Sequence, residues 1–160
     1  MSDEKKTLWK DRLAQSRTAT KELIASLNPD QWNTCVYTEG NEWTVRTIVS
    51  HLIDSERGMS IHIHKIRKGE PTLPEGFNLD HWNQDVTKRI GDLSPQEMVD
   101  RLDATRARTL EGLETLTDEE WSLTGRHGSR GVITIEQYYE TIVGHELNHI
   151  GEAKKALGLG

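Results

Sequence analysis

Four long stretches of the sequence repeat apolar residues at steps of three and four, and this period constrains the fold more than any other feature. Such spacing places the apolar side chains on one face of an α-helix, and that face must be buried against another element. The stretches run over 4–27, 45–68, 95–115 and 134–157. Four amphipathic helices of this length predict an all-α protein that folds as a four-helix bundle.

Residues that begin and end helices stand at the boundaries of these stretches. Ser94, followed by Pro95 and Glu97, forms a compact helix start in which serine caps the helix and proline occupies its first position. Thr44 is placed to cap the second helix, and Thr134 or Ile133 opens the fourth. The opposite ends are marked by prolines or glycines at Pro29, Gly69, Pro71 and Gly158.

The connections between the predicted helices differ in length. The connection between the second and third helices, 70–92, is long and leaves room for a short helix over 79–90. Residues 30–41 are expected to be irregular, with a strand-like or turn-like patch around 35–38. The glycine-rich stretch 125–131 predicts a loop.

Length, charge and cysteine content exclude several classes of protein. At 160 residues, we expect one domain spanning 1–160. The net charge is −6 without a basic cluster, so we expect no nucleic-acid partner. No apolar run approaches the ~20 residues that cross a bilayer, and residues 1–6 are polar, which together favour a cytoplasmic protein without a membrane partner. A single cysteine, Cys35, excludes an intrachain disulfide, and we expect it to be a small buried side chain.

Two histidines near the C-terminus stand four residues apart, at His145 and His149. On a helix they lie about 40° apart and one turn above each other, so both imidazoles can reach one cation. Both could instead be exposed in a helix rich in charge. The apolar neighbours Ile142, Val143, Leu147 and Ile150 favour a buried face here, and therefore favour the metal interpretation.

A metal site needs more than two ligands, and His51 is the best third candidate. It lies in the second predicted helix among apolar neighbours, although a lone histidine is more often packed or exposed than a ligand. His62 returns to the same face eleven residues later, but about 16 Å along the axis, so it cannot share an ion with His51. It could line the same groove. His81 and His127 are expected in solvent.

Glu152 and Tyr138 lie on the same stripe of the fourth helix as His145, each seven residues away and about 20° around the axis. Glu152 could be a fourth metal ligand, a general base, or a solvated surface residue. The five tryptophans are expected to close the ends of the bundle core rather than to stack on a substrate. They are Trp9, Trp32, Trp43, Trp82 and Trp121.

Two segments resemble motifs of a known family. Trp43-Thr44-Val45-Arg46, continued by His51-Leu52-Ile53-Asp54-Ser55-Glu56, is similar to the second-helix motif of the DinB-like superfamily. His145-Glu146-Leu147-Asn148-His149-Ile150-Gly151-Glu152 resembles its last-helix motif, in which glutamine usually stands where this chain has Glu152.

The resemblance implies a bundle with up-down-down-up connectivity, often a homodimer. It also implies one divalent metal ion, commonly nickel, zinc or iron, on His51, His145 and His149. Some relatives transfer bacillithiol, mycothiol or glutathione, and others are isomerases or hydrolases. The departure at Glu152 puts a direct transfer of the relatives' chemistry in doubt.

Three neutral imidazoles leave a divalent ion with open positions for water or substrate. A metal-held thiolate that attacks an electrophilic carbon predicts a thiol S-transferase, with a small-molecule substrate and a low-molecular-weight thiol as partners. A metal-held hydroxide predicts a hydrolase. The third possibility is a metal-binding bundle without catalysis. We favour the transferase, with Glu152 as its candidate catalytic residue.

Overall fold

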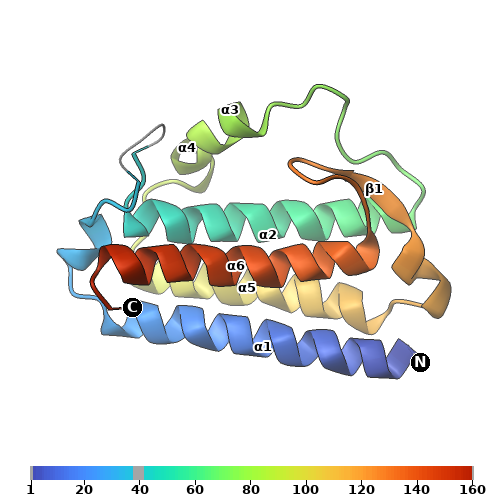
Figure 1. Cartoon of the computed structure of the whole chain (residues 1–160), viewed down its shortest axis with the longest axis horizontal. Coiled ribbons are helices and arrows are strands. Elements are labelled where there is room, and N and C mark those ends of the chain that lie inside the picture. The colour runs from blue at the N-terminus through green and yellow to red at the C-terminus, as the bar shows by residue number, and fades with distance from the viewer. Residues whose placement is uncertain (1, 38–41, 160) are drawn as a thin grey trace.

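Four long helices form the body of the protein, as the sequence predicts. The structure is a computed structural model, and it describes residues 2–37 and 42–159. Its long helices are α1 (Ser2–Ser26), α2 (Val45–Arg67), α5 (Pro95–Glu114) and α6 (Ile135–Ala156). They lie side by side as a four-helix bundle (Figure 1), in which α2 contacts both α5 and α6, and α1 contacts both as well.

The helices follow the up-down-down-up order that the DinB resemblance implies. Helices α1 and α6 run in one direction and α2 and α5 in the other (Figure 1). Because α2 and α5 are parallel, the chain between them must return along the whole length of α2, about 35 Å. This return carries two short helices, α3 (Leu79–Gln84) and α4 (Val86–Ile90), above α2 (Figure 1). The long predicted connection is therefore required by the topology.

The predicted helix caps are present. The Thr44 side chain accepts a hydrogen bond from the backbone N–H of Thr47. Ser94 and Glu97 form a reciprocal capping box at the start of α5, and Thr134 forms one at the start of α6. Each cap satisfies backbone N–H groups that the first helical turn leaves unpaired. Gly158 follows the last helix with a φ of 73°, the left-handed conformation that ends helices.

The predicted loop over 125–131 is wrong, because most of this segment forms a β-hairpin. Strand β1 (Thr124–His127) pairs antiparallel with β2 (Gly131–Thr134). Gly125 serves packing rather than a turn: a Cβ atom there would lie 2.6 Å from the Ile66 side chain of α2. The missing side chain at Gly125 lets the strand approach the helix closely. In the sequence, a glycine with this role cannot be told from a loop glycine.

The segment after α1 is mostly irregular, as expected. A short 3-10 helix, η1 (Gln31–Asn33), is followed by an isolated bridge between Cys35 and Thr44. The patch predicted at 35–38 is described only as far as Tyr37, and the predicted irregular residues 38–41 lie outside the described residues. The Cys35 side chain is exposed, so its predicted burial is wrong; the thiol turns back to the Tyr37 carbonyl instead of entering the core.

The buried apolar side chains form two clusters, one toward each end of the bundle. One cluster joins the end of α1, the first half of α2 and the end of α6, and the other joins the opposite ends of these helices. Four tryptophans belong to the clusters as expected. Trp82 does not: it lies on α3 and is 44% exposed, because α3 packs above α2 rather than inside the bundle.

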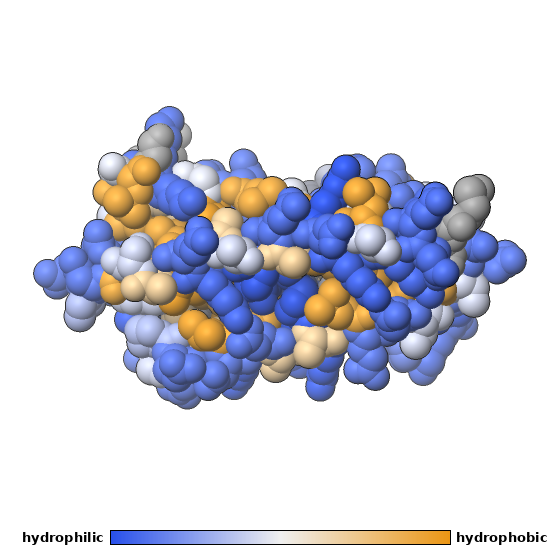
Figure 2. Space-filling model, turned by 90° about the horizontal axis from the view of Figure 1, so that it is seen from below, coloured by the Kyte–Doolittle hydropathy of each residue, from blue (hydrophilic) through white to orange (hydrophobic). Residues whose placement is uncertain are grey.

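The face of the bundle opposite α3 and α4 is mostly polar (Figure 2). The face seen in Figure 2 shows hydrophilic side chains over most of its area, with small apolar groups between them. None of the helices within 2–37 and 42–159 is both long and apolar enough to span a membrane.

Candidate metal centre

Three histidines converge between α2 and α6. His51 comes from α2, and His145 and His149 come from successive turns of α6. The Nε2 atom of His145 lies 3.0 Å from Nε2 of His51 and 3.0 Å from Nε2 of His149. The candidate ligand atoms of the three rings all lie within 4.8 Å of one another. Residues 94 positions apart in the sequence, His51 and His145, thus belong to one cluster of nitrogens.

The three imidazoles are held neutral by their surroundings. Burial, followed by the neighbouring histidines, lowers the pKa of His51 to about 2 and that of His145 to about 3. Burial also lowers the pKa of His149, although Glu152 acts in the opposite direction. At neutral pH each ring therefore has a lone pair available, which is the form that binds metals.

The Nδ1 side of the His149 ring is held by a carboxylate and a phenol. Glu152 Oε1 lies 2.8 Å from Nδ1 of His149 and accepts a hydrogen bond of 2.5 Å from the Tyr37 hydroxyl. A carboxylate at Nδ1 keeps the proton on that nitrogen and leaves the Nε2 lone pair directed at the cluster. This contact, with burial as the larger cause, also raises the pKa of Tyr37.

His51 is supported in a similar way. Its ring lies against the Trp43 indole, with ring centroids 4.7 Å apart. The Ser55 hydroxyl, one turn further along α2, lies 3.3 Å from His51 Nδ1. Packing on one side and a hydroxyl on the other restrict the rotation of the ring.

The donor set fits a divalent cation. A neutral imidazole nitrogen carries either one proton or one lone pair, so the three clustered Nε2 atoms cannot satisfy one another by hydrogen bonds. One cation can accept all three lone pairs at once. Nitrogens that share a tetrahedral zinc ion at ~2.05 Å are roughly 3.3 Å apart, close to the observed 3.0 Å. Zinc, nickel and iron all bind imidazole.

A cavity of about 620 Å³ opens beside the triad. Its floor is α2 and α6, and its other walls come from the return segment that carries α3 and α4 and from the β-hairpin. Both segments lie on the same side of α2 in Figure 1. Much of the wall is apolar, with Trp43, Met59, Leu73 and Phe77 among its residues. An ion on the triad would therefore face a space large enough for a small molecule.

An ion-pair cluster joins α3 and α4 to α2 beside the cavity. Arg89 donates to both carboxylate oxygens of Asp54, at 3.2 and 2.7 Å, and its guanidinium lies 3.7 Å from the Trp82 ring centroid. The Trp82 indole N–H also donates to Asp54, at 3.2 Å. These contacts account for the exposed indole, because Trp82 packs on arginine and carboxylate instead of the core.

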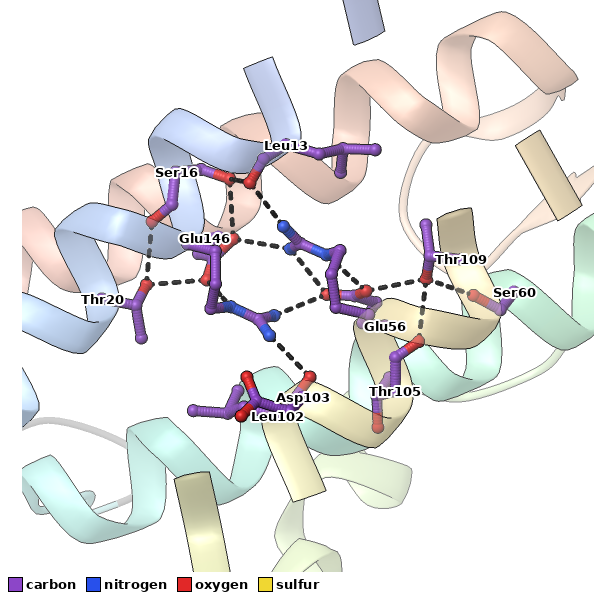
Figure 3. A network of polar contacts seen from close by, with 12 residues as sticks. Leu13, Ser16, Thr20, Glu56, Ser60, Leu102, Asp103, Thr105, Thr109 and Glu146 are labelled. Carbon is purple, nitrogen blue, oxygen red and sulfur yellow. Dashed lines mark hydrogen bonds and ion pairs between the residues drawn. The ribbon is translucent and has the colours of Figure 1, made fainter. Parts of the chain in front are cut away.

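A buried polar layer separates the two apolar clusters, and the sequence analysis did not foresee it (Figure 3). Arg17 donates to Glu146 and Glu56, each at 2.9 Å. Arg106 donates to both oxygens of Glu56 and to Glu146, each at 2.8 Å. The four residues are each at least nine-tenths buried, and each comes from a different long helix.

The charges of this layer balance and its acceptors are saturated. Ser16 and Thr20 donate to Glu146, and Thr109 donates to Glu56. Burial alone would raise the pKa of Glu146, but the adjacent arginines, Arg17 and Arg106, lower it to about 2. Such a network is satisfied in one alignment of the helices only. Because Glu146 adjoins His145, the layer also fixes the face of α6 that carries the histidines.

The structure places the remaining predicted site residues as follows. His62 lines the cavity, as the spacing suggested, and His64 and His81 are exposed. His127 was expected in solvent, but it is half-buried and lines the cavity, because it lies on the β-hairpin that forms one wall of the cavity. Tyr138 is fully buried and contacts His62 rather than the triad.

Comparisons with known proteins agree with this fold. YfiT from Bacillus subtilis, described as a probable metal-dependent hydrolase with an unusual four-helix bundle topology, is 26% identical over 151 residues, covering 94% of this chain and 83% of YfiT. Its solved structure matches this one with a TM-score of 0.77 and 25% identity, over 100% of this chain and 91% of that one. OB0413 from Oceanobacillus iheyensis, whose name suggests the same activity, is 24% identical over 150 residues, 93% of this chain and 83% of that protein.

A more distant solved structure shares the fold. The mycothiol-dependent maleylpyruvate isomerase matches with a TM-score of 0.70 at 14% identity, over 90% of this chain and 60% of that one. The family model of the DinB superfamily matches residues 12–153, from the first half of α1 to the last turn of α6. Because this family model covers most of the chain and the fold agrees, this chain belongs to the DinB superfamily.

Proposed function

We propose that this protein is a metal-dependent transferase, which joins a low-molecular-weight thiol to an electrophilic carbon of a small molecule. The metal ion would be held by His51, His145 and His149. The observation that carries the proposal is the position of these three neutral imidazoles at one wall of an apolar cavity. Structural metal sites are usually closed by four protein ligands, whereas a three-histidine set beside a cavity leaves a coordination position for a reactant.

A divalent ion bound there supplies a Lewis acid that lowers the pKa of a thiol, which makes the thiolate available at neutral pH. In the transfer, the sulfur electron pair forms the new S–C bond. The leaving group departs with the electron pair of its own bond to carbon, and the thiol proton passes to water. The thiol must come from a second small molecule, because Cys35, the single cysteine, does not line the cavity. A thiol of bacillithiol, mycothiol or glutathione type would serve.

The protein's own side chains position the reactants. Glu152 and Tyr37 hold the His149 ring with its Nε2 lone pair toward the cluster. Trp43, whose ring packs against His51, forms apolar wall beside the triad and would keep water from the thiolate. Excluding water strengthens the attraction between charges in the site and limits competing hydrolysis.

Hydrolysis is the second candidate, because the names of YfiT and OB0413 suggest it. An attacking water needs a base for its proton unless the metal alone lowers the water's pKa sufficiently. Among the described residues that line the cavity, the only carboxylate is Asp54, and its oxygens are engaged by Arg89 and Trp82. Glu152 contacts Nδ1 of His149, on the side of the ring away from the cluster, and does not line the cavity. A thiol starts from a pKa of about 8.5, far below that of water, so a bound metal can ionise it without such a base, and this favours transfer over hydrolysis.

The test compares both chemistries on one preparation. Protein loaded with nickel, zinc or iron(II) is incubated with each thiol and an electrophile panel, and separately with ester and amide panels without thiol. Thiol adducts whose formation requires metal and is lost in His51→Ala support the proposal. Metal-dependent ester or amide cleavage without thiol adducts would establish the hydrolase instead. Absence of both reactions with metal fully bound would favour a non-catalytic metal-binding bundle.

A further inference from the structure

The cavity has a second group of histidines, apart from the triad. His62 on α2 and His127 on β1 both line it. Their rings flank the Tyr138 ring, with centroid distances of 5.8 and 5.6 Å. His62 lies eleven residues after His51 on α2, about 16 Å along the helix axis. His62 is therefore too distant to contact an ion on the triad.

Hydrogen bonds fix the proton on His62. The Tyr138 hydroxyl lies 3.0 Å from the Arg126 carbonyl, which can only accept, so the hydroxyl proton points there. His62 Nδ1 lies 3.2 Å from the same hydroxyl oxygen, and both contacts are hydrogen bonds when Nδ1 carries the ring proton. The other nitrogen, Nε2, then has its lone pair free and makes no hydrogen bond to the described residues.

The proton on His127 is fixed in the opposite sense. Its Nδ1 accepts hydrogen bonds from the backbone N–H groups of Ser129 and Arg130, at 3.1 and 3.2 Å. These two donors come from the hairpin turn itself. In the neutral ring the proton is consequently on Nε2, which becomes a donor. The pair thus offers one acceptor, on His62, and one donor, on His127.

Both rings remain neutral near pH 7. Burial, then His127 and Lys65, lowers the pKa of His62 to about 4. Burial, then Arg130, lowers the pKa of His127. The cavity wall includes the apolar side chains of Met59, Leu73 and Phe77, and Met59 stands between His51 and His62 along α2. The cavity therefore has a metal-ligand set, an apolar middle and a neutral donor–acceptor pair.

We propose that His62 and His127 form a second recognition site that binds a neutral amide group. An amide presents both an acceptor and a donor, which complements the pair. The substrate would be elongated, with a reactive carbon near the triad, an apolar or aromatic middle, and the amide at its far end. This inference rests on the proposed function for the reactive end, but amide recognition can be measured without any reaction.

The experiment measures binding of two inert probes to metal-loaded protein by titration calorimetry. The probes are 4-(hydroxymethyl)benzamide, which ends in a primary amide, and 4-isopropylbenzyl alcohol, which has an isopropyl group of similar shape in its place and no amide. Two neutral hydrogen bonds predict a preference of about tenfold for the amide. We expect His62→Leu and His127→Leu each to remove most of this preference while leaving affinity for the isopropyl probe within about twofold.

His64→Leu is the matched control, because His64 lies on the same helix but is exposed. It should keep the wild-type preference, and circular dichroism checks that each variant is folded. Equal affinity of the wild type for both probes, or a preference unchanged in both cavity variants, overturns the inference. A failed thiol-transfer assay together with amide preference that depends on His62 and His127 refutes the proposed function while the recognition site stands.

Discussion

Glu152 contacts the Nδ1 side of the His149 ring: its Oε1 lies 2.8 Å from Nδ1, whereas Nε2 of the same ring faces His145. A carboxylate in this position acts through the histidine, because it fixes the ring and increases its basicity. The geometry supports a positioning role for Glu152 more than the roles of metal ligand or general base.

We predict that Glu152→Gln weakens metal affinity by about 10- to 100-fold, the usual effect of losing such a partner. Competition with a chromophoric chelator measures the affinity. Glu22→Gln, an exposed position on α1, is the control and should leave it unchanged. Wild-type metal affinity with turnover reduced by about 10²- to 10⁴-fold would instead identify Glu152 as a general base.

Arg106→Met should lower the free energy of unfolding by about 3–5 kcal/mol, because it leaves Glu56 and Glu146 buried with one arginine between them. Urea denaturation followed by circular dichroism provides the measurement. Lys21→Met removes one partner of an exposed ion pair with Asp103, and it should cost at most about 1 kcal/mol. Similar small losses in both variants would show that the buried layer is not a major source of stability.

The Arg67–Glu120 pair predicts a dependence of stability on acid. Arg67, whose Nε lies 2.9 Å from the carboxylate, holds the pKa of Glu120 below its usual 4.5. A depressed pKa contributes stability above the unfolded value and loses it as the pH falls through the folded value. The difference in unfolding free energy between wild type and Glu120→Gln should therefore be constant above about pH 5 and shrink below about pH 4. A difference independent of pH between 3 and 7 would refute the pairing.

Arg89 keeps α3 and α4 against α2 through Asp54 and Trp82. Arg89→Leu should increase quenching of tryptophan fluorescence by acrylamide, because Trp82 is the one exposed indole among tryptophans that are otherwise buried. Lys88→Leu, at the exposed neighbouring position, should leave quenching unchanged. Equal quenching in all three proteins would mean that the ion pair does not hold this segment.

The helical fold and the three histidines could be predicted from the sequence for physical reasons. Apolar period, caps and helix-ending residues act locally, so they indicate α2, α5 and α6 almost to the residue. His145 and His149 are one turn apart on one helix, a relation that spacing alone determines. His51 could be named as the best third candidate from its apolar neighbours, but its meeting with the pair rested on the family resemblance, because nothing local states which helices meet.

What escaped prediction depends on contacts across the bundle. Arg17 and Glu56 look like ordinary surface charges until four helices bring them together in the buried layer. Gly125 looks like a loop residue, although it permits a close approach to Ile66. His127 became part of the cavity only through the hairpin. The homodimer and the cytoplasmic location stay predictions.

Metal content tests the central claim most directly. Protein purified without chelators or a nickel column should contain about one divalent ion per chain by elemental analysis, and each of His51→Ala, His145→Ala and His149→Ala should lose it. His64→Ala, at an exposed position, should retain it. Full metal content in His149→Ala, or none in the wild type after incubation with zinc, nickel and iron(II), would contradict a metal site on this triad.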